Sequence, residues 1–207
     1  MKRIAIFDLD YTLLDTVRFK IDLNGVFFPF SVFTSDYQTL FKDYGINYNF
    51  QKHLLYLKEA GRIKTEKDEK IIKEKFADFF KTINKYIFPQ VEEVIVYFKN
   101  KGVKIVLATF GDLDFHKLKI ENLRIKDYFD EIFYTDDGMN GKIEFLKNIK
   151  EDNDEIFIIN DKAKESLDML GIIGNKGRLF LMRGPYSENV AHNKKMYDKI
   201  GDIIKDV

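Results

Sequence analysis

Two aspartates at the end of the first apolar run are the residues best suited to chemistry. Asp8 and Asp10 follow the wholly apolar stretch from Ile4 to Phe7, which is typical of a strand buried on both faces of a parallel sheet. In an extended segment a spacing of two directs both carboxylates to the same side. Two like charges held together disfavour ionisation unless a cation joins them. With oxygen ligands and no cysteine in the chain, this pattern favours magnesium over a softer metal.

Two further apolar runs end in polar residues that suit phosphate or metal chemistry. Residues 103–108 are followed by Thr109, and residues 156–159 are followed by an asparagine and then Asp161. In a parallel α/β sheet the carboxyl ends of the strands share one edge, where sites form. The sequence therefore predicts that Asp8, Thr109 and Asp161 lie close together.

The stretch FDLDYTLLDT, residues 7–16, resembles the first motif of the haloacid dehalogenase (HAD) superfamily, an Asp-x-Asp-x-Thr loop. The resemblance implies that Asp8 is the nucleophile and that Asp10 is the acid and base of both half-reactions. It also implies magnesium held by Asp8, Asp161 and the backbone carbonyl of Asp10. Tyr11 departs from the family, which often has glycine there, and we expect this side chain to narrow the pocket.

The second and third motifs of the family fall on later strand and helix ends. Thr109 takes the position of the second-motif hydroxyl, and Phe110 beside it is implied as a substrate-binding residue. The third motif is a lysine at a helix start about twenty residues before the metal-binding acid. Lys142 stands 19 residues before Asp161 and is our choice, with Lys147 as the reserve. This lysine is implied in both catalysis and substrate binding.

The fourth motif begins at Asp161, where the family has a magnesium ligand. A second acid follows one helical turn later, and this chain has Glu165 where the family more often has aspartate. The spacing of four puts both acids on one helix face. Glu165 either supports the metal shell or belongs to an ordinary helix surface, and the sequence leaves both open.

Helical periodicity predicts an insertion over residues 16–86, between the first two strands. In the family such an insertion is a cap over the active site, and we expect its aromatic stripe to form core. Arg18 is the expected contact for a second anionic group of the substrate. The predicted helices of the insertion start at the capping box Ser35-x-x-Gln38 and end at Gly45, run from Phe50 to Ala60, and begin at Thr65.

The rest of the chain predicts alternating helices and strands. The expected elements are a helix from about 91 to Gly102, a helix capped by Asp112, a strand over 131–134 before the turn Asp136-Asp137-Gly138, a helix opened by Gly141-Lys142, a strand over 178–182, and a last amphipathic helix carrying Met196, Ile200, Ile203 and Ile204.

Composition excludes several classes of function. The 207 residues include 34 basic and 34 acidic ones, so neither a nucleic-acid groove nor an anionic membrane surface is indicated as a partner. The absence of cysteine excludes disulfides and thiolate chemistry and fits a cytoplasmic protein. No apolar run approaches a membrane span or a signal peptide. The three histidines, His53, His116 and His192, match no zinc spacing and are assigned no role.

These patterns together predict an α/β protein with a Rossmann-like parallel sheet core over 1–15 and 87–207 and an all-helical cap over 16–86. The resemblance implies a magnesium-dependent phosphatase that hydrolyses a small phosphorylated metabolite, as a monomer or homodimer. A phosphomutase or a dehalogenase on the same scaffold, and a non-catalytic module that binds magnesium or phosphate, are the alternatives.

Overall fold

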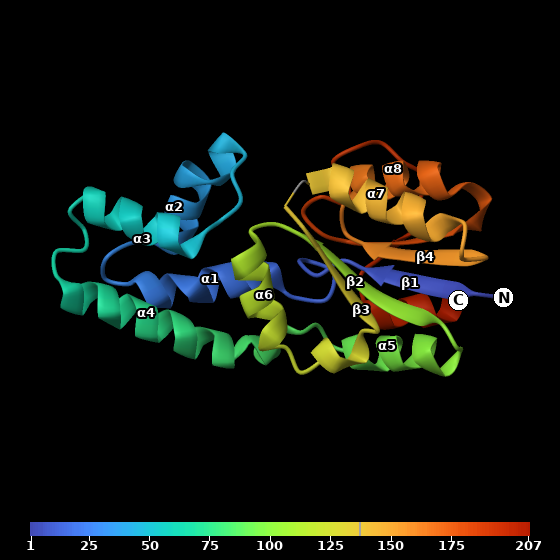
Figure 1. The fold of residues 1–207 in the computed structure, drawn as a ribbon, viewed down its shortest axis with the longest axis horizontal. Coiled ribbons are helices and arrows are strands. Elements are labelled where there is room, and N and C mark those ends of the chain that lie inside the picture. The colour runs from blue at the N-terminus through green and yellow to red at the C-terminus, as the bar shows by residue number, and fades with distance from the viewer. Residues whose placement is uncertain (137) are drawn as a thin grey trace. The chain divides into compact units, whose positions relative to one another are not determined.

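The computed structural model describes residues 1–136 and 138–207, which form two compact units (Figure 1). The core unit comprises Met1–Asp15, Ile87–Phe110 and Ile125–Val207, and the helical unit comprises Thr16–Tyr86 and Gly111–Arg124. The sequence analysis assigns residues 111–124 to the core, whereas the contacts in the structure group this segment with the helical unit. Within the described residues, no helix is both long and apolar enough to cross a membrane.

The core unit is built on a six-stranded sheet in the order β3-β2-β1-β4-β5-β6, in which every neighbouring pair is parallel. Its strands are β1 (Arg3–Phe7), β2 (Lys104–Phe110), β3 (Glu131–Thr135), β4 (Glu155–Asn160), β5 (Gly177–Met182) and β6 (Met196–Tyr197). Its helices are α5 (Val91–Asn100), α7 (Gly138–Lys150) and α8 (Ala163–Ile173), with short 3-10 turns η3 (Lys126–Tyr128), η4 (Gly174–Lys176) and η5 (Ile200–Asp206). The predicted Rossmann-like α/β class is confirmed.

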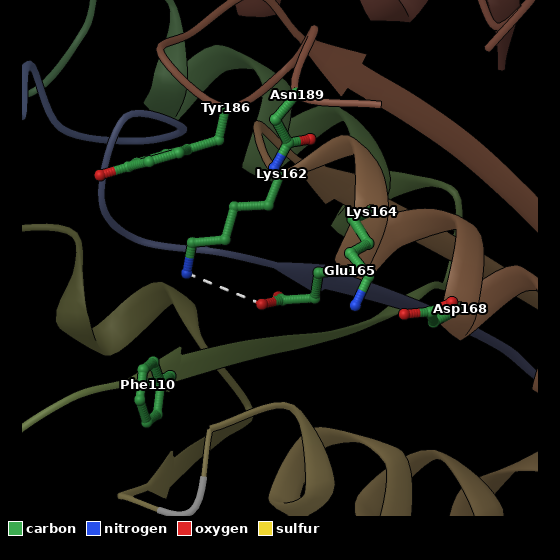
Figure 2. A pocket seen from close by; sticks show the side chains of 7 residues that line it. All are labelled: Phe110, Lys162, Lys164, Glu165, Asp168, Tyr186 and Asn189. Carbon is green, nitrogen blue, oxygen red and sulfur yellow. Dashed lines mark ion pairs between the residues drawn. The ribbon is translucent and has the colours of Figure 1, made fainter. Parts of the chain in front are cut away.

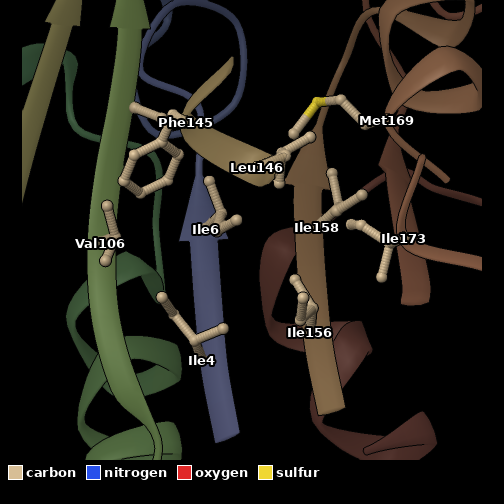
Figure 3. Packing of buried hydrophobic residues seen from close by; sticks show 10 residues of the cluster. Ile4, Ile6, Val106, Phe145, Leu146, Ile156, Ile158, Met169 and Ile173 are labelled. Carbon is tan, nitrogen blue, oxygen red and sulfur yellow. The ribbon is translucent and has the colours of Figure 1, made fainter. Parts of the chain in front are cut away.

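The central strand β1 is buried on both faces, as its apolar sequence predicts. On one face Ile4 and Ile6 pack against the neighbouring strands and against α7 and α8, for example on Leu146 and Met169 (Figure 3). On the other face the ring of Phe7 meets that of Phe98 on α5, with 5.9 Å between the ring centroids. Helices therefore cover both faces, and only the strand ends are left for polar groups.

The helical unit consists of α1 (Thr16–Phe27), α2 (Phe33–Leu40), η1 (Lys42–Tyr44), α3 (Phe50–Glu59), α4 (Glu66–Lys81), η2 (Ile83–Tyr86) and α6 (Leu113–Glu121). Its core is aromatic: the Phe19 ring contacts those of Phe80, Tyr86 and Phe115 edge to face. Buried rings pack at such angles because the positive ring edge meets the negative face. The aromatic residues of this unit are thus largely core, as the sequence analysis expects.

One polar cluster adjoins this aromatic core: Ser31, Asp36 and His53 are buried, and the exposed Arg62 reaches them from the surface. Asp36 accepts hydrogen bonds from the Ser31 hydroxyl and from Arg62 Nη1 at 3.1 Å, and it lies 3.1 Å from His53 Nε2. Burial alone would raise the pKa of Asp36, but the hydrogen bonds from Ser31, His53 and Arg62 outweigh it and lower the pKa. For His53, burial outweighs the neighbouring carboxylate and lowers the pKa of the imidazole. Every member of this cluster therefore has a partner within it.

Several helix boundaries follow from tertiary contacts rather than from the local sequence. The predicted helix start at Thr65 is confirmed, and the structure adds a capping box there: the Thr65 side chain accepts from the Asp68 N–H while Asp68 accepts from the Thr65 N–H. The predicted start at Ser35 is wrong, because α2 begins at Phe33. Asn24 Oδ1 accepts the Thr34 N–H at 3.0 Å and so satisfies the helix start without Ser35.

Two other predicted elements of the core differ from the structure. The last amphipathic helix is wrong, because Met196 and Tyr197 form β6 by pairing with Leu181 and Met182 at the open edge of β5. Only the segment after it is helical, as the 3-10 helix η5. Helix α7 begins at Gly138 rather than at Gly141, and Asp137 of the predicted turn lies outside the described residues.

Candidate active site

The loop after β1 places Asp8 at the carboxyl edge of the sheet. The Asp8 N–H continues the sheet ladder by donating to the Ile159 carbonyl of β4 at 2.9 Å, and its side chain is buried. The Leu13 and Leu14 N–H groups then both donate to the Leu9 carbonyl, which folds residues 9–14 into a tight loop. Asp8 is thus held by both the strand and the loop.

Tyr11 lies at the tip of this loop with a φ of 61°, in the left-handed region. A side chain there costs energy that glycine avoids, which explains why the family often has glycine at the position. The Tyr11 ring packs edge to face on Tyr186, with 5.7 Å between ring centroids. This contact compensates part of the backbone cost.

Lys142 makes the closest contact with Asp8. Its Nζ lies 2.6 Å from Asp8 Oδ1 and 2.7 Å from Glu165 Oε1, and the lysine side chain is 2% exposed. A buried ammonium needs paired charges and satisfied donors, and these two carboxylates supply both. The reserve residue Lys147 is exposed in the last turn of α7. The geometry therefore favours Lys142 for the role of the third-motif lysine.

Glu165 anchors Lys142 and therefore does not belong to an ordinary helix surface, while support of the metal shell stays a prediction. Besides Lys142, its Oε1 accepts a hydrogen bond from Asn160 Nδ2 at 2.9 Å, and its Oε2 lies 3.7 Å from Lys162 Nζ. Burial alone would raise the pKa of Glu165, but the charges of Lys142 and Lys162 and these hydrogen bonds outweigh burial and lower the pKa below its usual value. Glu165 is therefore ionised and fixes the position of the lysine beside Asp8.

Asp161, at the end of β4, is the most unusual group of the site. It is fully buried, and within the described chain neither carboxylate oxygen has a hydrogen-bond partner. Burial, and then the negative charge of Asp8, raise the pKa of Asp161 well above its usual range, with a smaller contribution from Asp10. Gly184 lies so close that an added Cβ would come within 3.1 Å of Asp161 Oδ2.

This unpaired carboxylate fits a bound cation. Burying an ionised carboxylate without a partner is costly, and a divalent ion between it and Asp8 would remove that cost. No group of three or more His, Cys, Asp or Glu side chains in residues 1–136 and 138–207 is arranged to hold a metal. The expected ligand set needs fewer side chains, because Asp10 would contribute its backbone carbonyl. Two carboxylates, a carbonyl and waters are ligands that magnesium accepts.

The remaining predicted residues are placed as follows. Thr109 is buried, and Phe110 is half-buried at the carboxyl end of β2, next to β1 in the sheet. Asp10 is half-buried in the loop after β1, and Thr12 is fully buried there. Arg18 lies in α1 of the helical unit with its guanidinium 5.9 Å from the centre of the Tyr86 ring.

A cavity of about 300 Å³ opens beside this edge of the core unit (Figure 2). Phe110, Lys162, Tyr186 and Asn189 are among the residues that line it. Burial lowers the pKa of Lys162, but Asp8, Glu165, Asp161 and Asp10 outweigh burial and raise it. Lys162, Gly184 and Tyr186 are not among the residues predicted for the site. No sequence signal indicates Gly184 or Tyr186, and for Lys162 the available signal is its position directly after Asp161.

A family model of haloacid dehalogenase-like hydrolases matches residues 2–159 of the 207. The chain therefore belongs to the haloacid dehalogenase-like hydrolases, and the resemblance drawn from its motifs is confirmed. The matched range contains Asp8, Asp10, Thr109 and Lys142 and ends two residues before Asp161. A comparison with curated proteins found no significant match.

Solved structures share the fold at low sequence identity. A protein from Burkholderia xenovorans described as a haloacid dehalogenase-like hydrolase is 18% identical, with a TM-score of 0.75 over 99% of this chain and 95% of that one. A predicted phosphoglycolate phosphatase from Haemophilus somnus is 15% identical, with a TM-score of 0.62 over 99% and 97%. An L-2-haloacid dehalogenase from Xanthobacter autotrophicus, with chloropropionic acid covalently bound, is 11% identical, with a TM-score of 0.63 over 99% and 98%. At these identities the likeness concerns the fold alone.

Proposed function

We propose that the protein is a magnesium-dependent phosphomonoester hydrolase that acts on a small phosphorylated metabolite. The observation that supports this proposal is the buried Asp161 carboxylate, which has no hydrogen-bond partner in the described chain. The negative charge of the nearby Asp8 raises the pKa of Asp161. A carboxylate in that position needs a cation, and a cation beside a carboxylate nucleophile suits an anionic phosphate substrate.

Asp8 is the proposed nucleophile. Lys142 holds Asp8 Oδ1 at 2.6 Å, so that Oδ2 would attack phosphorus in line with the leaving oxygen. The bond from phosphorus to the leaving oxygen breaks as the bond to Asp8 forms, which gives an aspartyl-phosphate. Asp10 donates a proton to the departing alkoxide.

Asp10 then acts in the opposite direction. It takes a proton from a water molecule that attacks the phosphorus of the aspartyl-phosphate, and inorganic phosphate leaves while Asp8 is regenerated. Thr109, at the end of β2, and Lys142 would donate hydrogen bonds to the oxygens of the transferring phosphoryl group. Phe110, next to Thr109, would contact the substrate from its half-buried position.

Asp8, Asp161 and the backbone carbonyl of Asp10 would hold the magnesium ion. When bound, the ion supplies positive charge that offsets the attacking carboxylate and the phosphate oxygens. The helical unit is proposed as a cap that excludes water when closed and releases product when open.

The choice between a phosphatase and a dehalogenase depends on Asp10. The solved structures with this fold include a predicted phosphoglycolate phosphatase and an L-2-haloacid dehalogenase, and a shared fold does not decide between the two activities. A halide leaves carbon without a proton, whereas an alkoxide needs an acid. A carboxylate at position 10 therefore supports phosphoryl chemistry.

Phosphate release from an aryl phosphate, measured with and without magnesium, tests the proposal. We expect release that requires magnesium and that stops on chelation. Full activity after chelation, or metal-independent halide release from a 2-haloacid, would contradict it. Transfer of phosphate to a second hydroxyl of the substrate, in place of release, would indicate a phosphomutase, and binding without turnover would indicate a non-catalytic module.

A further inference from the structure

Lys162 faces the cavity beside the proposed nucleophile, and its ammonium is less closely paired with carboxylates than that of Lys142. Lys142 is buried and lies within 2.7 Å of two carboxylates, so its hydrogen-bonding capacity is committed to the site. The side chain of Lys162 is 26% exposed. In the described part of the chain its ion pair is with Glu165 Oε2 at 3.7 Å, which is too long for a hydrogen bond.

The surroundings of Lys162 suit an organic ligand that carries a charge. Figure 2 shows the lysine directed into the space between Tyr186 and Phe110, and its Nζ lies 5.8 Å from the centre of the Phe110 ring. Aromatic faces bind the carbon skeleton of a ligand, and Asn189 can donate or accept a hydrogen bond. A cavity of about 300 Å³ admits a small metabolite.

The charges at the carboxyl edge of the sheet also favour the binding of an anion at Lys162. In the proposed phosphatase, Asp8 and Asp161 would hold the magnesium ion, and Glu165 is paired with Lys142. Lys164 and Asp168 also line the cavity, but Lys162 is the lysine that lies against the Phe110 ring, with its Nζ 3.7 Å from Glu165 Oε2.

We propose that Lys162 determines specificity by binding a second anionic group, a carboxylate or a phosphate, on the leaving alcohol of the substrate. This inference rests on the proposed phosphatase function and names its substrate class: phosphate monoesters with a second anion. It assigns to the core unit a role that the sequence analysis gives to Arg18. The phosphoryl group reacts at Asp8 while the second anion lies in the cavity.

Matched substrate pairs test the inference. 3-Phosphoglycerate and glycerol 3-phosphate differ in a carboxylate, and fructose 1,6-bisphosphate and fructose 6-phosphate differ in a phosphate. We expect the wild type to prefer, in at least one pair, the compound with the second anionic group. The pair that shows this preference also identifies whether that group is a carboxylate or a phosphate. Lys162→Met keeps the length of the side chain and should lower kcat/KM for that member by roughly ten- to a hundredfold, mainly through KM. For the compound without the second anionic group, kcat/KM should change by less than about threefold, which also shows that the variant folds.

Three variants complete the design. Lys162→Arg keeps the charge and should retain most of the preference. Lys104→Met removes an exposed lysine at the amino end of β2, paired with Glu131 at 2.7 Å, and should change neither rate. Arg18→Met compares the alternative contact, and we expect it to leave the ratio of the two rates unchanged.

Each result has a separate meaning. An equal loss for both members of a pair, a wild type without preference, or a selective loss in Arg18→Met rather than in Lys162→Met would overturn the inference. In each of these cases magnesium-dependent release from an aryl phosphate would still support the phosphatase. No phosphate release from any monoester would reject the phosphatase itself, and the inference with it.

Discussion

The two units of this protein each bury an aspartate, and they treat it in opposite ways. Asp36 in the helical unit is surrounded by Ser31, His53 and Arg62, which satisfy its oxygens and lower its pKa. Asp161 in the core unit is fully buried, has no hydrogen-bond partner in the described chain, and has a raised pKa. Burial is the first cause acting on both carboxyls, so the difference lies in what surrounds them.

This difference separates a structural charge from a functional one. A satisfied buried cluster holds helices together and gains nothing from a ligand. An unsatisfied buried carboxylate costs stability in the absence of a cation, and a protein that retains one uses it for binding or catalysis. The comparison therefore predicts that changes in the core unit affect turnover and metal binding, whereas changes at Asp36 affect folding.

Asp8→Asn should have the largest effect. Removing the nucleophile should lower phosphate release by on the order of 10⁴-fold or more while the fold is retained, since the Asn oxygen can still accept a hydrogen bond from Lys142. Steady-state kinetics and circular dichroism measure the two expectations. A variant within about a hundredfold of the wild type would show that Asp8 is not the nucleophile.

Asp10→Asn should have the next largest effect. It removes the proton donor, so turnover of alkyl phosphates should fall by about 10²- to 10⁴-fold. Nitrophenyl phosphate needs little help in leaving, so we expect a burst of nitrophenolate followed by slow turnover as the aspartyl-phosphate waits for a base. Rapid mixing measures the burst. Wild-type turnover of alkyl phosphates in this variant would remove the distinction from a dehalogenase.

The sequence predicts the core of this site because its signals are local. A buried strand reads as an apolar run, and Asp8, Thr109 and Asp161 follow such runs at the edge where parallel strands end. Lys142 follows from a resemblance in spacing, and the structure brings it within 2.6 Å of Asp8 across 134 residues of sequence.

Other features depend on contacts between distant segments and leave no local signal. His53 of α3 meets Asp36 of α2 only in the folded structure, and nothing in the spacing of the histidines indicates this contact. Met196 forms a strand because β5 offers an open edge, although the later isoleucines favour a helix. The cavity role of Lys162 needs Phe110 from a different strand.

Asp36→Asn tests the structural half of the comparison. The change removes the carboxylate to which Ser31, His53 and Arg62 are hydrogen-bonded, and we expect the free energy of unfolding to fall by about 2 kcal/mol. Urea titration followed by circular dichroism measures it. Asp78→Asn is the matched control in the same unit, because its pair with Lys81 is exposed on both sides and should contribute less than about 0.5 kcal/mol. Equal effects of the two substitutions would contradict a structural role for the buried cluster.

Magnesium should stabilise the wild type through Asp161. At a magnesium concentration one hundred times Kd, binding to the native state alone adds about 2.7 kcal/mol to the free energy of unfolding. Asp161→Asn should lose this gain, and without magnesium it should be about as stable as the wild type, since it replaces a buried carboxyl group that has no hydrogen-bond partner in the described chain. Thermal unfolding with and without magnesium measures both. A metal-free variant that is clearly less stable than the metal-free wild type would place Asp161 with Asp36 as a structural charge.

The smallest expected effect is the pH dependence of the helical unit near neutrality. Burial lowers the pKa of His53, with Asp36 acting against it and Arg62 in the same direction as burial, so the unfolded chain binds the proton more readily than the native one. The contribution of His53 to the free energy of unfolding is therefore fully present above the ordinary imidazole pKa of about 6.5. It is lost as the pH falls through that value towards the lowered native pKa. The slope from this one group cannot exceed about 1.4 kcal/mol per pH unit. The lowered pKa of Asp36 adds a second loss at more acidic pH, below about 3.9. His53→Gln cannot titrate and should reduce the loss of stability between pH 6.5 and the lowered native pKa of His53, while His116 and His192 are present in both proteins. Urea titrations at a series of pH values between 7 and 5 give the comparison. If the wild type instead gains stability on acidification and His53→Gln does not, the ion pair with Asp36 outweighs burial, and the buried cluster would be held by charge rather than by hydrogen bonds to a neutral imidazole.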